Sequence, residues 1–165
     1  MYKTYKVLLV EDDLTHAMIV KQLLHQSKEF SFQVQHATYL SGAVSLLTKE
    51  NFDVVLLDLN LPDSQGTDTI EKILHTNSTV PIMSITGYEA TGSLSKYLNN
   101  GIQDYLEKKD LLNTKLSARI QFAIQRKQNE SSLSGPLKPL PISQPGGFQP
   151  LPAQASDINE SWIKV

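Results

Sequence analysis

Residues 54–66 read VVLLDLNLPDSQG, an unbroken apolar run that ends at an acid and is followed by turn-forming residues. The run Val54–Leu57 is short, continuous and rich in branched side chains, which is typical of a strand buried on both faces of a sheet. After Asp58, the residues from Leu59 to Gly66 include asparagine, proline, aspartate, serine and glycine, a composition that predicts a loop. The pattern therefore predicts a buried strand with a carboxylate at its carboxyl end.

This strand is one of five, and helical patterns separate them. The other strand patterns lie at Val7–Val10, Phe32–Ala37, Pro81–Ile85 and Tyr105–Glu107. Helical spacing of apolar residues occurs at about 14–24, 43–47, 67–75, 94–98 and 111–128, and Asp13 is placed to cap the first helix. Because strands and helices alternate, we expect an α/β fold, a doubly wound five-stranded parallel sheet with helices on both faces.

Apolar residues recur at helical spacing in the first and last of these helices. In the first helix the stripe comprises Leu14, Ala17, Met18, Val20, Leu23 and Leu24. In the last helix it comprises Leu112, Leu116, Ile120 and Ala123 or Ile124.

Composition limits the classes of function. The 165 residues are 40% hydrophobic and 19% charged, which is ordinary for a globular protein. A formal net charge of -2 disfavours direct binding of nucleic acid. The chain has no cysteine, which excludes thiolate chemistry and fits a reducing compartment. The apolar run after the basic N-terminus is too short for a signal peptide or a membrane span, so we expect a cytoplasmic protein with no membrane partner.

The character of the chain changes after Asn129, where prolines lie among serine, glutamine and glycine. This composition is typical of an extended linker. We therefore expect a folded domain over residues 1–128 and a tail or linker over residues 129–165.

Polar residues follow the ends of several predicted strands. They are Glu11 and Asp12 after the first strand, Asp58 after the third, Thr86 after the fourth and Lys108 after the fifth. Ligands of an open parallel sheet bind beyond the carboxyl ends of its strands, so these side chains should meet at one edge. Neighbouring carboxylates repel one another unless a cation joins them, and their oxygens suit Mg²⁺ or Mn²⁺.

The same set of residues fits chemistry on a phosphoryl group. A divalent ion would screen the Asp58 carboxylate from an approaching phosphate and permit attack on it. Lys108 and the Thr86 hydroxyl could then hold the phosphoryl oxygens as charge develops.

In these motifs the chain resembles the receiver domains of response regulators, the phosphorylated components of two-component signalling. The resemblance covers Lys6 to about Gln128. It rests on the pair Glu11-Asp12, the stretch from Asp58 to Asp63 followed by Gly66, the step Thr86-Gly87, and the run Tyr105-Leu106-Glu107-Lys108.

The resemblance implies a flavodoxin-like sheet of order 2-1-3-4-5 and a role for each site residue. Asp58 corresponds to the phosphoacceptor. Glu11 and Asp12 correspond to the metal-binding acids, Glu11 through water, and Asn60 would offer its backbone carbonyl. Lys108 would contact the phosphoryl group, and the catalysis would be confined to the domain itself, so the chain would not be an enzyme acting on a separate substrate.

The resemblance also implies a switch. Thr86 and Tyr105 correspond to the pair that rearranges on phosphorylation, altering the face made by the fourth helix, fifth strand and fifth helix. That face would contact a downstream effector or form a homodimer, and the phosphoryl donor would be a histidine kinase or a histidine phosphotransfer protein. Asn60 and Tyr88 lie where side chains tune the lifetime of the phosphorylated state.

One departure from the family is that Lys108 is followed by Lys109 where most relatives have proline, so Lys109 is a second candidate for the lysine. The residues His16, His25, His36 and His75 show no metal-ligand spacing and are interpreted as surface or packing residues.

Two other functions compete with the switch. A receiver-like module that docks constitutively, without phosphorylation, would have the same fold. A phosphatase of the haloacid dehalogenase type also uses an aspartate, a lysine and Mg²⁺. In that family, however, the nucleophile follows the first strand and a second aspartate lies two residues on, whereas Asp58 follows the third strand and Asn60 occupies the second position.

Overall fold

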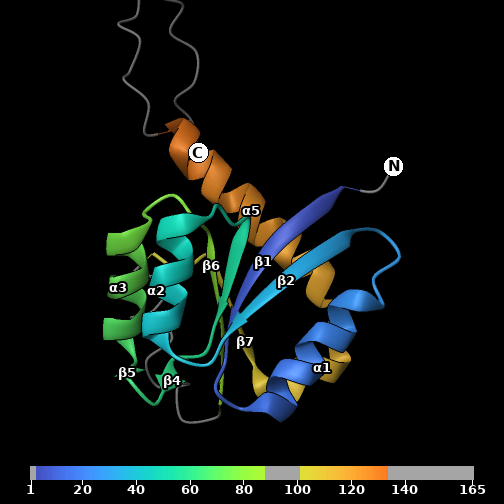
Figure 1. The fold of residues 1–165 in the computed structure, drawn as a ribbon. Coiled ribbons are helices and arrows are strands. Elements are labelled where there is room, and N and C mark those ends of the chain that lie inside the picture. Colours follow the sequence, from blue (N-terminus) through green and yellow to red (C-terminus); the bar gives the residue numbers. More distant parts are fainter. Residues whose placement is uncertain (1–2, 88–100, 134–165) are drawn as a thin grey trace, which may run out of the picture. The chain divides into compact units, whose positions relative to one another are not determined.

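Five parallel strands form one sheet in the order β2-β1-β3-β6-β7 (Figure 1). The strands are β1 Thr4–Val10, β2 Ser31–Ala37, β3 Val54–Leu57, β6 Ile82–Thr86 and β7 Asp104–Glu107. The computed structural model describes residues 3–87 and 101–133. Counted along the chain, the five strands have the predicted order 2-1-3-4-5, so the flavodoxin-like doubly wound fold is confirmed.

Helices cover both faces of this sheet (Figure 1). They are α1 Leu14–His25, α2 Leu40–Lys49, α3 Thr67–Thr76 and α5 Leu116–Leu133, with a 3₁₀ helix, η2, at Lys108–Asn113. α5 continues through Gln128 to Leu133.

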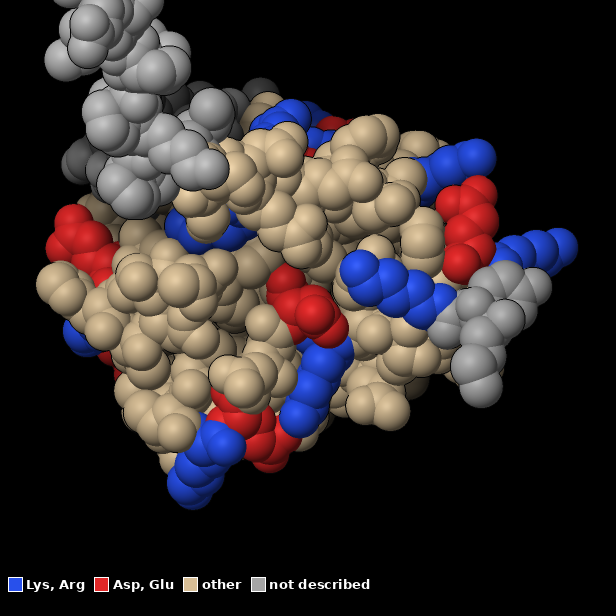
Figure 2. Space-filling model, turned by 90° about the horizontal axis from the view of Figure 1, so that it is seen from above, with Lys and Arg blue, Asp and Glu red and all other residues tan. Residues whose placement is uncertain are grey.

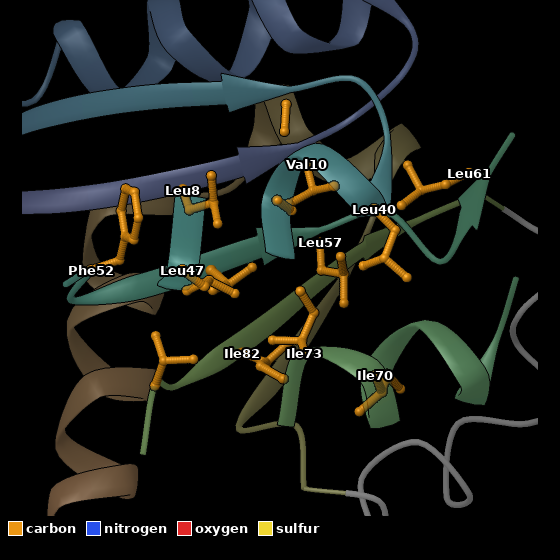
Figure 3. Close-up of a cluster of buried hydrophobic side chains, with 14 of the residues drawn as sticks. Leu8, Val10, Leu40, Leu47, Phe52, Leu57, Leu61, Ile70, Ile73 and Ile82 are labelled. Atoms are coloured by element: carbon orange, nitrogen blue, oxygen red, sulfur yellow. The ribbon is translucent and has the colours of Figure 1, made fainter. Parts of the chain in front are cut away.

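Alternate residues of each central strand face opposite cores. Leu8 and Val10 of β1 belong to a cluster with side chains of α2 and α3, and Figure 3 shows Leu40, Leu47, Ile70 and Ile73 meeting Leu57 and Ile82 there. Val7 and Leu9 belong to a second cluster with α1, η2 and α5. Full burial of one such aliphatic side chain stabilises the fold by about 1.5–3 kcal/mol. Burial on both faces explains why the strand sequences are continuous apolar runs.

Two aspartates cap helices. Asp13 accepts hydrogen bonds from the backbone N–H groups of Thr15 and His16 at 2.7 and 3.2 Å, which confirms the predicted cap of α1. Asp63 accepts from the N–H groups of Leu40 and Ser41 at 2.8 and 3.0 Å, so a distant loop caps α2.

The loop after Asp58 is more regular than its composition predicted. Its strands β4, Asn60–Leu61, and β5, Ser64–Gln65, pair antiparallel as a small hairpin. Gly66 follows with φ at 59°, a left-handed conformation that favours glycine.

Three apolar residues of the helical patterns are exposed. Leu14 and Met18 of α1 are 64% and 70% exposed, because Ala17, Val20 and Leu24 form the buried stripe. Leu112 is 72% exposed because the last helix begins at Leu116 instead of about Leu111. The extended backbone at Thr114, with φ -117° and ψ 139°, separates η2 from α5. In η2 it is Leu111 that is buried.

The fourth helix expected around residues 94–98, Tyr88 and most of the tail fall outside the described residues. No helix within residues 3–87 and 101–133 has the length and apolar character needed to cross a membrane. Figure 2 shows the end of the molecule opposite the β4–β5 hairpin, where basic and acidic side chains are interspersed.

Candidate functional site

The sheet brings Glu11 and Asp58 to the same edge. β1 and β3 are neighbours in register, with Val10 beside Leu57, so the next residue of each strand emerges at the same level. The Asp58 N–H donates to the carbonyl of Val10 at 2.9 Å, and the Glu11 N–H donates to Ala37 at 3.0 Å. These bonds fix both backbones, and the two residues are only 4% and 2% exposed.

Three carboxylates form a cluster at this edge. One oxygen from each of Glu11, Asp12 and Asp58 lies within 4.8 Å of the others, and Asp12 is the exposed member. Burial raises the pKa of the Glu11 carboxyl; the hydrogen bond from Lys108 opposes this shift, and the nearby charge of Asp58 adds to it. An all-oxygen set with a surplus of negative charge has the chemistry that Mg²⁺ and Mn²⁺ require, so these residues fit the expected metal.

Lys108 lies between the two buried acids. Its Nζ donates to Glu11 Oε1 at 2.8 Å and to Asp58 Oδ2 at 2.7 Å. Burial by itself would lower the pKa of Lys108, but the hydrogen bonds to Asp58 and Glu11 raise it above its ordinary value. The side chain is 15% exposed, so its charge is poorly screened by water. Lys109, the second candidate for this role, instead pairs with Glu107 at 2.5 Å.

The remaining predicted residues differ in their proximity to the carboxylates. The Asn60 N–H donates to Asp58 Oδ1 at 3.0 Å, which orients the carboxylate. Thr86 is 6% exposed at the end of β6, and its hydroxyl makes a long contact with the Gly87 carbonyl at 3.4 Å. Tyr105 is half-buried on β7 and packs against the α2–α3 core. Tyr88 falls outside the described residues.

Two histidines expected to be surface or packing residues lie beside the site. His16 Nδ1 is 3.4 Å from Lys108 Nζ and 3.4 Å from Asp13 Oδ2. His36 Nε2 is 2.8 Å from the Glu11 carbonyl. The spacing of three residues between Asp13 and His16 at a helix start could have indicated the first. The second depends on the β1–β2 register, which places His36 beside Leu9 and which the sequence does not specify.

Comparison with protein families gives one match over most of the chain. The family model described as the response regulator receiver domain matches residues 7–121. Similar proteins include the transcriptional regulatory protein CitT of Halalkalibacterium halodurans, which is 30% identical over 92% of this chain and 69% of its own length. The transcriptional regulatory protein ZraR of Klebsiella oxytoca is 27% identical, with 93% of this chain and 33% of that protein aligned. The cell cycle transcriptional regulator CtrA of Caulobacter vibrioides is 29% identical over 76% of this chain. The chain spans only about half of that protein, at 53%.

Solved structures agree in fold. The signal receiver domain of an HD domain-containing protein from Pseudomonas fluorescens aligns with a TM-score of 0.66 and 22% identity, over 80% of this chain and 95% of that chain. A CheY-like receiver domain protein from Methanospirillum hungatei aligns with a TM-score of 0.60 and 24% identity, over 79% and 99%. At these identities the likeness establishes the fold alone.

Proposed function

Because the chain belongs to the response regulator receiver domain family, we propose that it is a phosphorylation switch in which Asp58 accepts a phosphoryl group. Receiver domains are signalling domains, so the chain would catalyse phosphoryl transfer only onto its own aspartate and would not act on a separate substrate. The observation that carries this proposal is the contact of one ammonium, Lys108, with two buried carboxylates, Glu11 and Asp58, at the carboxyl edge of the sheet. We propose that the receiver domain expected over residues 1–128 extends to the end of α5 at Leu133, and that the remainder is its tail.

In the proposed reaction an oxygen of Asp58 attacks the phosphorus atom of the donor. The bond between phosphorus and the donor nitrogen breaks, its electron pair returns to that nitrogen, and an acyl phosphate forms on Asp58. The hydrogen bond from the Asn60 N–H holds Oδ1 in place. In the structure, Lys108 donates a hydrogen bond to Asp58 Oδ2. In the reaction, Lys108 would instead donate to one phosphoryl oxygen, and the Thr86 hydroxyl would donate to another.

Glu11, Asp12 and Asp58 would hold the divalent ion, which supplies positive charge against the incoming phosphate. We propose Mg²⁺ or Mn²⁺ on the basis of the oxygen donors. Asn60 would add its backbone carbonyl. An ion at this position would also offset the mutual repulsion of the three acids, so removing it should weaken phosphoryl uptake.

We propose that the phosphorylated state is reported by Thr86 and Tyr105. Thr86 aligns with Glu107 across β6 and β7, and Tyr105 aligns with Ser84, two residues before Thr86. Movement of the Thr86 hydroxyl toward the phosphate would vacate space beside Tyr105, which is already half-buried. The ring would then turn inward and change the face that includes β7 and α5, where an effector or a second copy would bind.

The test is mass spectrometry of the full chain after incubation with a small phosphodonor, with and without Mg²⁺. We expect a single phosphoryl adduct that requires the metal and is lost in Asp58→Asn. Asp63→Asn is the matched control, since it changes an aspartate in the same loop and should still form the adduct. If the wild type forms no adduct with any donor, the constitutive docking module becomes the better explanation.

We propose that exposed apolar side chains near the site receive a protein donor. Leu14 and Met18 occupy one exposed face of α1, four residues apart, and η2, which packs against α1, exposes Leu112. α1 begins two residues after Asp12, and η2 begins at Lys108, so these apolar side chains border the site. A histidine kinase or phosphotransfer protein must contact this border to bring its phosphohistidine to Asp58. We therefore propose that Leu14, Met18 and Leu112 form the donor-docking surface.

Substitution separates docking from chemistry. Leu14→Ser with Met18→Ser should slow transfer from a protein donor but leave the uptake from a small phosphodonor unchanged. Phe122→Ser is the matched control, because Phe122 is 61% exposed but lies on α5. Equal slowing with both kinds of donor would contradict the docking role.

We also propose that the protein is cytoplasmic, since a chain without cysteine suits a reducing compartment.

A further inference from the structure

The side chains of Asp104 and Arg119, which form an ion pair, both bind the main chain of Tyr105. The Tyr105 N–H donates to Asp104 Oδ1 at 2.9 Å, and the Tyr105 carbonyl accepts from Arg119 Nη2 at 2.6 Å. β7 is the last strand of the described sheet, so its outer side has no neighbouring strand there. Both the N–H and the carbonyl of Tyr105 are therefore hydrogen-bonded to side chains.

Arg119 connects this point to α5. Its Nε donates to Asp104 Oδ2 at 2.8 Å and its Nη2 to Asp104 Oδ1 at 2.7 Å, in addition to the bond to Tyr105. A planar guanidinium with three such bonds fixes the relative position of its acceptors in a way that a single ammonium does not. The two side chains are 33% and 16% exposed, so the pair is partly shielded from water.

A second arginine on the same helix makes a related contact. Arg126 Nη1 donates to the carbonyl of Gln103 at 2.5 Å. Arg119 and Arg126 are seven residues apart, so they lie on one face of α5. α5 is thus bound to β7 through Arg119, and to Gln103, the residue before β7, through Arg126; only the first contact includes Tyr105.

We propose that the Asp104–Arg119 pair is a positioning device that couples the backbone of Tyr105 to α5. The inference rests on the proposed function, because it assigns the route by which a rearrangement at Thr86 and Tyr105 reaches the output face. A change in the Tyr105 backbone that accompanies turning of its ring moves the carbonyl held by Arg119. α5 then moves with the guanidinium, or the bond breaks and α5 is released. In either case the signal at α5 requires Arg119.

The test uses the full chain with Mg²⁺ and BeF₃⁻ as the phosphoryl mimic. The ¹⁹F signal of bound BeF₃⁻ reports occupancy of Asp58, and the amide shifts of Ile120 and Ala123 report the response of α5. We expect Arg119→Gln and Arg119→Lys to bind BeF₃⁻ as the wild type does, while the α5 shifts fall by more than about half. Lys115→Gln removes one exposed charge a turn earlier and should respond as the wild type does.

Several outcomes would overturn the proposal. Full-sized α5 shifts in Arg119→Gln would show that the signal takes another route. Full-sized shifts in Arg119→Lys would reduce the role of Arg119 to its charge. Absence of a bound ¹⁹F signal in the wild type would instead refute the proposed function, and the coupling with it. If Arg119→Gln does not fold, Asp104→Asn, which keeps the shape of the side chain, provides the same comparison.

Discussion

Replacing Lys108 with methionine removes the only ammonium that the described residues place against Glu11 and Asp58. Methionine approximates the length of the side chain, so the main change is the loss of charge and of two hydrogen bonds. Both carboxylates are almost fully buried, at 2% and 4% exposure. Removing one partner of a buried ion pair typically destabilises a protein by about 3–5 kcal/mol, because it leaves charge uncompensated. We expect a loss of that size in the free energy of unfolding of Lys108→Met at neutral pH without divalent metal.

The assay is urea unfolding followed by circular dichroism, with the dependence on denaturant checked for a constant slope. Mg²⁺ should narrow the gap between Lys108→Met and the wild type, because an ion that binds only the folded state stabilises it and no longer competes with the ammonium. The gap should also close in acid, where the carboxylates take up protons.

Lys109→Met is the matched control. The Lys109 side chain is 57% exposed, and surface pairs contribute about 0–1 kcal/mol. A loss in Lys108→Met no larger than that of the control would refute the view that this ammonium compensates the buried acids. A gap that Mg²⁺ leaves unchanged would refute the metal assignment.

Three further predictions concern the site and its frame. The pKa of the Glu11 carboxyl in the folded protein lies above its ordinary value of 4.5. The buried carboxyl therefore adds to the stability of the fold below about pH 4.5, and this stability is lost as the pH rises through the pKa of the folded state. Glu11→Gln should therefore be more stable than the wild type at neutral pH without metal, with no advantage below about pH 4.5; thermal unfolding across pH checks this, and an unchanged profile would contradict it. Asp63→Ala should lower the free energy of unfolding by about 0.5–2 kcal/mol in urea, since it removes the cap of α2, and a neutral result would show that the cap contributes nothing. Gly101 has φ at 93°, and a Cβ there would lie 3.0 Å from Leu74 Cδ1, so Gly101→Ala should destabilise by about 1–3 kcal/mol. Gly42→Ala, whose Cβ would meet Ala37 at an ordinary 3.6 Å inside α2, should be neutral or stabilising, and equal losses would contradict the strain argument.

The strands could be predicted from sequence because full burial leaves an unmistakable pattern. Val54–Leu57 is apolar at every position, and the structure buries every position. The convergence of Glu11 and Asp58 followed from the rule that parallel strands end at one edge, and the β1–β3 register bears that rule out.

The helix faces were less predictable because an apolar residue does not have to be buried. Leu14 and Met18 fit the helical period but lie on the exposed side of α1. Leu112 fits the stripe of the last helix only if the helix is continuous, and the extended backbone at Thr114 breaks it. These exposed positions follow Asp12 and Lys108 within a few residues along the chain, where we propose a docking surface.

Side-chain partners across the fold were beyond the sequence. The contact of Asp63 with α2 and the contact of Arg119 with Asp104 join segments whose proximity depends on the packed structure. His36 reaches the Glu11 carbonyl only because β2 lies beside β1 in a particular register.

The proposed phosphorylation of Asp58 is tested most directly by identifying the residue that carries the phosphoryl group. The full chain is loaded from a small phosphodonor with Mg²⁺, digested in acid and mapped by mass spectrometry. We expect the adduct on the peptide that contains Asp58, at a level that falls to background when Mg²⁺ is chelated. An adduct on any other residue, or on Asp58 at an equal level without metal, would contradict it.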